Sequence, residues 1–131
     1  VLKLRLGSHE SPLVTQGGAD LLLALDEQEG LRNLSYLKSG GTVLVNSENE
    51  FPQTVLIELQ RLQIKTQIIN ATELARNLGK VNAANVILAG AVAALPAVSL
   101  SKEDLQNTAA AMSPKAADLN CRAVELGYNV F

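Results

Sequence analysis

The clearest hydrophobic pattern in the chain lies at residues 17–47, where two uncharged runs enclose an amphipathic segment. The runs are Leu21–Leu25, which lies between two aspartates, and Thr42–Val45. Uncharged runs of this length are typical of strands that are buried on both faces. Between them, the leucines of Leu31–Leu37 recur at helical spacing. The stretch therefore predicts a β-α-β unit whose helix ends at Ser39–Gly41.

Two of the expected helices begin with residue pairs that are typical of a capping box. Asp26 is followed three residues later by Glu29, and Asn70 is followed by Glu73. The first side chain of such a pair accepts a hydrogen bond from a backbone N–H of the first helical turn. We therefore predict that Asp26 and Asn70 cap helices, the second of which covers Ala71–Leu78 and ends at a glycine.

Further along the chain, strands and helices alternate first and helices then follow alone. The other expected elements are an alternating edge strand at Val1–Leu6, a helix that starts at Pro52, a strand at Ile64–Ile69, and helices at Asn82–Leu95, from Ser101 to about Met112, and from Pro114 to Leu126. This order predicts an α/β fold of three layers, in which a mostly parallel sheet is flanked by helices and followed by a helical C-terminal part.

Composition and charge narrow the functional classes. At 131 residues the chain is expected to form a single domain, and its net charge of −2 with scattered lysines and arginines argues against a nucleic-acid partner. Its one cysteine, Cys121, excludes an internal disulfide and fits a reducing compartment, so we expect a cytoplasmic protein.

One uncharged stretch, residues 81–101, approaches the length of a membrane span. It contains Asn82, Asn85 and Pro96, and polar side chains are costly in hydrocarbon. We therefore expect a buried helix here and no membrane association.

Several groups that often carry chemistry lack the spacing that the chemistry requires. Gly17–Gly18 and Gly40–Gly41 do not fit a phosphate-binding motif. His9 and Cys121 are single residues of their type, so neither a zinc site nor a Cys–His pair has its spacing signature. The carboxylates at 26–29 suit a helix N-terminus. We therefore expect these glycines, His9, Cys121 and the carboxylates to have structural roles.

Polar side chains follow each expected strand of the sheet, and the carboxyl ends of parallel strands are where such folds bind ligands. The candidate binding residues are Asp26, Asn46, Ser47, Asn70 and Thr72, with Asn82 and Asn85 on one face of a helix start. Asn and Ser are also common in turns and helix caps, which is the alternative reading of every one of these positions. No catalytic residue and no metal ligand is expected.

Four segments, taken in order, resemble one protein family. They are Ala19–Asn46, Ile69–Gly79 (INATELARNLG), Asn82–Leu95 (NAANVILAGAVAAL) and Asn120–Tyr128 (NCRAVELGY). Together they are similar to the γ-type domain of 2-oxoacid:ferredoxin oxidoreductases, and within that family to the β subunit of indolepyruvate oxidoreductases. The similarity extends over essentially the whole chain.

The resemblance implies a non-catalytic subunit or domain of an enzyme that converts a 2-oxoacid, here indolepyruvate or another aryl pyruvate, to an acyl-coenzyme A. Such complexes use thiamine diphosphate, iron–sulfur clusters and coenzyme A, and they pass electrons to ferredoxin. The thiamine and cluster sites are implied to lie on a large partner subunit, with no cofactor held by this chain alone. The single cysteine agrees, because a cluster needs several thiolates. The implied role is assembly of the complex and a border to the coenzyme A or substrate site.

The chain departs from the family pattern at one point. Members normally begin with a strand and a Gly-Gly-Gln-Gly turn, and Gln16–Gly18 lies in the wrong place to replace it. We therefore expect a γ-type domain that is trimmed at its N-terminus or degenerate, with a sheet edge that is also open to a second copy of the chain. Two alternatives remain: an independent nucleotide- or coenzyme A-binding module at the Asp26 edge, and an interaction domain without a ligand.

Overall fold

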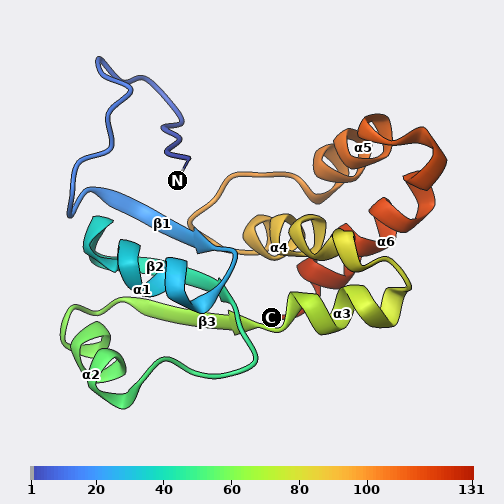
Figure 1. Ribbon diagram of the computed structural model, residues 1–131. Helices are drawn as coiled ribbons and strands as arrows, with labels where there is room; N and C mark the ends of the chain where they lie inside the picture. The colour runs from blue at the N-terminus through green and yellow to red at the C-terminus, as the bar shows by residue number, and fades with distance from the viewer. Residues whose placement is uncertain (1) are drawn as a thin grey trace. The chain divides into compact units, whose positions relative to one another are not determined.

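The computed structural model describes residues 2–131 and shows an α/β chain built on a three-stranded parallel sheet (Figure 1). The strands are β1 (Ala19–Ala24), β2 (Leu37–Asn46) and β3 (Lys65–Ile69), in the spatial order β1-β2-β3. β1 and β2 are parallel, with Leu22 opposite Val43. This places β1 at one edge of the sheet and β2 in its centre.

Within residues 2–131, six α-helices follow the order that the hydrophobic pattern predicts. They are α1 (Glu27–Asn33), α2 (Gln53–Arg61), α3 (Ala71–Leu78), α4 (Ala84–Ala93), α5 (Lys102–Met112) and α6 (Ala117–Tyr128), with short 3-10 turns η1 (Leu34–Tyr36), η2 (Val81–Ala83) and η3 (Pro114–Ala116). The prediction of a parallel sheet with a helical C-terminal part is therefore confirmed.

The chain divides into two compact units. Unit 1 comprises the residues up to Val45 together with Glu50–Gln67, and unit 2 comprises Asn46–Asn49 together with Ile68–Phe131. Unit 1 thus holds β1, almost all of β2, α1 and α2, whereas unit 2 holds the last residues of β3 and the helices α3 to α6.

Unit 1 is organised around the central strand. Val43–Val45 is completely buried, as expected for a strand that is covered on both faces. A Cβ at Gly30 of α1 would lie 3.2 Å from the Phe51 ring and 3.3 Å from the Cβ of Ala24, so the helix packs closely on β1 and on this ring. Because Gly30 has no side chain, α1 can lie this close to β1 and to the Phe51 ring.

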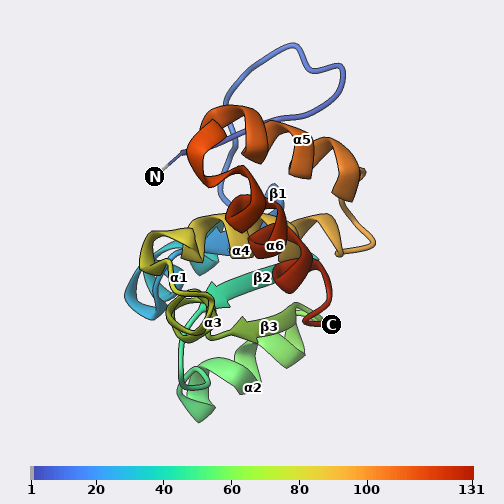
Figure 2. The ribbon, with the colours of Figure 1, turned by 90° about the vertical axis from the view of Figure 1, so that its right-hand side faces the viewer.

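Unit 2 is organised around the pair α4 and α6, which pack directly on one another (Figure 2). The contact brings backbone against backbone at two glycines. A Cβ at Gly90 would lie 2.3 Å from the Val124 carbonyl oxygen, and a Cβ at Gly127 would lie 1.8 Å from the Ile87 carbonyl oxygen. Only glycine can occupy either position without moving the helices apart.

A buried amide joins three segments of unit 2. The Asn120 Nδ2 group of α6 donates to the Ala109 carbonyl oxygen of α5 at 2.9 Å, and the Asn120 Oδ1 atom accepts from Lys80 Nζ at 2.8 Å. Asn120 is buried, so these two bonds satisfy an amide that would otherwise be costly to remove from water.

Four local predictions are wrong. The uncharged run Leu21–Leu25 is not buried on both faces, because Leu23 and Leu25 are exposed and the strand β1 lies at an edge of the sheet. The segment 2–6 forms no strand; within the described residues, 2–14 make no backbone–backbone hydrogen bond, and a strand needs a paired neighbour. Val1, the first residue of that predicted strand, lies outside the described residues. The first helix stops at Asn33, because Leu34 belongs to η1 and Leu37 to β2. Pro52 precedes α2 as its N-cap and is not its first residue.

The uncharged stretch at residues 81–101 is divided between η2, α4 and a non-helical segment. Among residues 2–131, no helix is both long enough and apolar enough to cross a membrane.

Candidate functional site

The ends of β2 and β3 meet the start of α3 within unit 2, and a cluster of candidate residues converges there. Asn46 Oδ1 accepts from the backbone N–H groups of Ala71 at 2.9 Å and of Thr72 at 3.4 Å. Asn46 Nδ2 donates to Thr72 Oγ1 at 3.0 Å. Asn70 Oδ1 accepts from the Glu73 N–H at 3.0 Å, which is the predicted cap. We call Asn46, Asn70 and Thr72 the α3 clamp.

Ser47 lies beside the α3 clamp and bonds to neighbouring backbone. Its N–H donates to the Ile69 carbonyl oxygen at 3.1 Å, which extends the pairing of β2 with β3 beyond the end of β2. Its hydroxyl donates to the Asn49 carbonyl oxygen at 2.8 Å and accepts from the Asn49 N–H at 3.0 Å. This is the geometry of a serine turn.

The clamp uses the groups that make a helix N-terminus attractive to anions. The N–H groups of Ala71, Thr72 and Glu73 all point to side-chain oxygens of the chain itself. A ligand at this place would have to displace Asn46 or Asn70. The arrangement therefore suits positioning of α3 better than direct binding.

The other candidate residues lie apart from the clamp. Asp26, in unit 1, accepts from the Glu29 N–H at 2.9 Å through Oδ1 and so caps α1 as predicted. Asn82 and Asn85 are exposed at η2 and the first turn of α4, and the N-cap of α4 is Ala83, without a side-chain cap. Asn82 and Asn85 therefore do not cap this helix.

Replacing Asn46 with alanine should destabilise unit 2. The substitution leaves the N–H of Ala71 and the hydroxyl of Thr72 without their partner, and loss of a cap of this kind costs about 1–2 kcal/mol. Urea unfolding followed by circular dichroism measures the change. The matched control is Asn85→Ala, an exposed asparagine whose loss should stay within about 0.5 kcal/mol. Equal shifts for the two variants would contradict the clamp.

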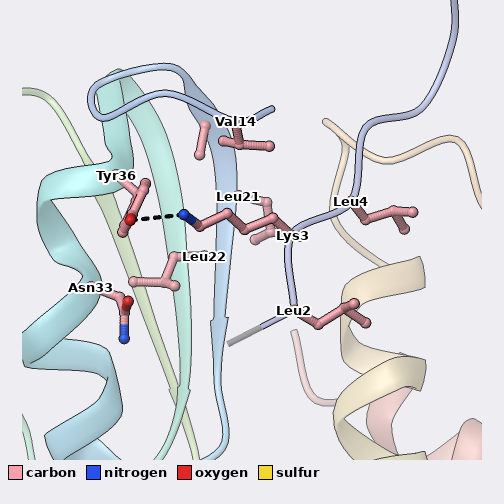
Figure 3. A pocket seen from close by; sticks show the side chains of 9 residues that line it. Leu2, Lys3, Leu4, Val14, Leu21, Leu22, Asn33 and Tyr36 are labelled. Carbon is pink, nitrogen blue, oxygen red and sulfur yellow. Dashed lines mark hydrogen bonds between the residues drawn. The ribbon is translucent and has the colours of Figure 1, made fainter. Parts of the chain in front are cut away.

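Unit 1 has a shallow hollow of about 90 Å³ between the N-terminal segment and β1 (Figure 3). It is lined by Leu2, Lys3, Leu4, Val14, Ala19, Leu21, Leu22, Asn33 and Tyr36. Lys3 Nζ donates to the Tyr36 hydroxyl at 2.8 Å and lies 4.0 Å from the centre of its ring. Pockets for cofactor-sized ligands measure about 300–1,000 Å³, so a nucleotide or coenzyme A does not fit this hollow.

Among residues 2–131, the donor side chains do not come together as an iron–sulfur cluster or a metal centre would require. Cys121 is the only cysteine, whereas a cluster takes several thiolates. Within residues 2–131, no three histidine, cysteine, aspartate or glutamate side chains come together as metal ligands. The Cys121 thiol instead lies 3.6 Å from the Gln106 carbonyl oxygen, between α5 and α6.

The two carboxylates whose pKa is lowered, those of Glu58 and Glu125, lie on the surface of helices. A hydrogen bond from Asn129, together with the Lys102 ammonium group, holds the pKa of Glu125 below its usual range. A hydrogen bond from Arg61 does the same for the pKa of Glu58. A lowered pKa keeps a carboxylate charged at neutral pH. This suits the ion pair of Glu58 within α2 and that of Glu125 between α5 and α6, and it does not suit a general acid.

Comparisons with known proteins agree with this fold. The profile of the pyruvate ferredoxin/flavodoxin oxidoreductase family matches residues 1–130. Indolepyruvate oxidoreductase subunit IorB of Archaeoglobus fulgidus is 29% identical, over 96% of this chain and 70% of the relative. The protein of the same name from Pyrococcus horikoshii is 33% identical, over 88% of this chain and 64% of the relative.

Two solved structures share the fold. The γ subunit of a keto/oxoacid ferredoxin oxidoreductase from Geobacter sulfurreducens aligns with a TM-score of 0.69 and 28% identity, over 86% of this chain and 63% of that one. Pyruvate oxidoreductase subunit PORC from Thermotoga maritima aligns with a TM-score of 0.68 and 22% identity, over 83% and 61%, and supports the fold alone.

The chain spans about two thirds of the length of these relatives. The family profile covers nearly all of its residues, and the fold agrees with that of a γ subunit. The chain therefore belongs to the pyruvate ferredoxin/flavodoxin oxidoreductase family.

Proposed function

We propose that the chain is a non-catalytic subunit or domain of a 2-oxoacid:ferredoxin oxidoreductase that acts on indolepyruvate or another aryl pyruvate. The observation that carries the proposal is the family match over residues 1–130, together with relatives that are named indolepyruvate oxidoreductase subunits. The single cysteine fits a cytoplasmic complex whose redox centres lie elsewhere.

The reaction of such a complex joins a 2-oxoacid and coenzyme A to give an acyl-coenzyme A, carbon dioxide, a proton and two electrons that reduce ferredoxin. Thiamine diphosphate and iron–sulfur clusters, held by a large partner subunit, supply the carbanion and electron-transfer chemistry. This chain offers one thiol and no group of metal ligands in its described part, so its contribution is assembly and a border to the coenzyme A or substrate site.

Within unit 2, the α3 clamp supports this border indirectly. The clamp fixes the start of α3, and α3 packs against η2 and α4. Those elements carry Asn82 and Asn85, whose amides are exposed and share one side of the helix start. We assign Asn82 and Asn85 to the surface that meets the partner or its coenzyme A, and the α3 clamp to positioning. Asp26 is a further exposed candidate.

Co-expression with a large subunit that carries thiamine and ferredoxin-type cysteine motifs tests the proposal. We expect a stable complex that co-purifies through affinity and size-exclusion steps. The double variant Asn82→Glu, Asn85→Glu should weaken the complex or raise its KM for coenzyme A, because it places two charges on the proposed surface. Asn107→Glu, an exposed asparagine of α5, is the matched control and should change neither. If the wild-type chain and the large subunit did not associate, this result would contradict the proposal.

Calorimetry separates this proposal from an independent nucleotide-binding module. Coenzyme A and adenine nucleotides, added to the isolated chain, should give no binding heat at about millimolar concentration, because the start of α3 is closed by its own clamp. Saturable heat with the isolated chain would favour the independent module.

A further inference from the structure

Helix α5 is fastened to the rest of unit 2 differently from the two helices beside it. Ala109 is the only buried residue of this described helix, whereas α4 buries Ile87 and Leu88 together with small residues. The partner helix α6 buries Ala123 and Val124 in the same way. Because buried apolar surface is the main source of stability, α5 gains less from its packing than α4 and α6 gain from theirs.

Polar contacts hold α5 against α6 instead. Gln106 Nε2 donates to the Cys121 carbonyl oxygen at 3.2 Å and to Glu125 Oε2 at 3.3 Å. Lys102 Nζ donates to Glu125 Oε1 at 3.3 Å. We call Lys102, Gln106 and Glu125 the latch. The side chains of Lys102 and Glu125 are 32% and 47% exposed, so water reaches the ion pair.

Separation of α5 from α6 would exchange these contacts for contacts with water. A hydrogen bond within a protein contributes little net stability when both partners can bond to water after it breaks, and a partly exposed ion pair also contributes little. The same applies to Asn120, whose amide donates to the Ala109 carbonyl oxygen. By contrast, α4 and α6 touch backbone to backbone at Gly90 and Gly127, and water cannot replace that packing.

Both ends of α5 adjoin residues that can absorb a movement. Residues 94–101, which connect α4 to α5, contain neither helix nor strand (Figure 1). At the other end, Ser113 leaves the helix with φ −147° and ψ 87°. Loop and element-terminal residues of this kind commonly serve as hinges. The helix can therefore swing away without a change in α4 or in most of α6.

We propose that α5 is a flap that opens as a unit while α4 and α6 stay packed on one another, and that the latch sets how often it opens. Opening uncovers the side of α6 where the Cys121 thiol lies 3.6 Å from the Gln106 carbonyl oxygen. The flap depends only on contacts within unit 2. It requires neither a large partner subunit nor coenzyme A and is therefore independent of the function proposed above.

Hydrogen exchange of the full chain, measured by mass spectrometry of its peptides, tests the flap. We expect the amides of α5 to be protected at least about tenfold less than those of α4 and α6, because they exchange through a local opening. Low concentrations of urea should accelerate exchange in α4 and α6 more than in α5, since a local opening exposes less surface than global unfolding. Equal protection of all three helices would overturn the proposal.

The variant Gln106→Ala tests the latch in the same experiment. It removes the two hydrogen bonds from this side chain to α6, so exchange in α5 should rise by about fivefold or more while α4 and α6 stay unchanged. Asn107→Ala alters the next, exposed residue of α5 and is the matched control. Alanine favours the helix in both variants, so the control should not accelerate exchange. An equal rise in all three helices, or none in α5, would contradict the latch.

The Cys121 thiol provides a second measurement of the same opening. Its thiolate attacks the sulfur–sulfur bond of an aromatic disulfide reagent, which forms a mixed disulfide and releases one aromatic thiolate whose absorbance gives the rate. We expect Gln106→Ala to raise this rate together with the exchange of α5, and Asn107→Ala to leave it unchanged. A thiol rate that is the same in wild type and Gln106→Ala would show that α5 does not open over Cys121.

Discussion

Replacing Gly127 with alanine should unfold unit 2 or destabilise it by at least about 3 kcal/mol. The new Cβ would lie 1.8 Å from the Ile87 carbonyl oxygen and 2.8 Å from the Ala91 N–H nitrogen. Both atoms belong to the backbone of α4, so no side-chain rotation relieves the clash. The helices α4 and α6 must separate, and the apolar contacts between them are lost.

A loss of stability at Gly127→Ala would indicate a close contact between α4 and α6, because the same change normally stabilises a helix. Alanine is normally the better helix former by about 1 kcal/mol, so an interior Gly→Ala change without a close contact stabilises a helix. Urea unfolding followed at 222 nm measures the free energy of unfolding for Gly127→Ala and for Arg122→Ala, an exposed position of the same helix. A Gly127→Ala variant at least as stable as wild type would show that α4 and α6 do not cross at this residue.

Replacing Asn120 with leucine should cost about 2–3 kcal/mol. The change removes the hydrogen bonds to the Ala109 carbonyl oxygen and from Lys80, and it leaves an ammonium group facing an apolar side chain. The cost arises mainly from polar groups that lose their partner in a buried place, because the leucine itself has a similar volume.

A second variant separates this cause from a simple packing error. Adding Lys80→Met to Asn120→Leu removes the unpaired ammonium group, so the double variant should recover part of the loss in the same urea experiment. Asn107→Ala on the exposed side of α5 serves as the surface control. If the double variant were the less stable of the two, the hydrogen bond from Lys80 would not be the source of the effect.

The sequence was most informative where local chemistry decides local structure. Asp26 and Asn70 cap α1 and α3 at the predicted residues, and Gly79 ends α3 in the left-handed conformation. The uncharged run Thr42–Val45 became a buried part of β2. These features depend on a few neighbouring residues, so the pattern along the chain contains the necessary information.

Features that depend on distant segments were not predictable in this way. The alternation at residues 2–6 indicates a strand, but whether a strand forms depends on a paired neighbour. Asn120 lies among the apolar positions of α6, which was a visible signal of a buried amide, yet its partners come from α5 and from the residue before η2. The close approach at Gly127 likewise depends on α4.

In the candidate site too, the sequence predicted which residues lie together but not what they do there. The sequence grouped Asn46, Ser47, Asn70 and Thr72 because each follows a strand, and the structure does bring them together in unit 2. Spacing alone could not distinguish binding from positioning. The hydrogen bonds within the α3 clamp favour positioning, and Asn82 and Asn85 stay exposed.

We propose that the chain completes an oxidoreductase whose cofactors lie on a partner subunit. Ferredoxin reduction by the purified large subunit, with an aryl pyruvate and coenzyme A, tests this proposal when it is measured before and after this chain is added. We expect substrate- and coenzyme A-dependent reduction that rises with added chain and saturates at a fixed ratio of the two subunits. Full activity of the large subunit alone, unchanged when the chain is added, would contradict it.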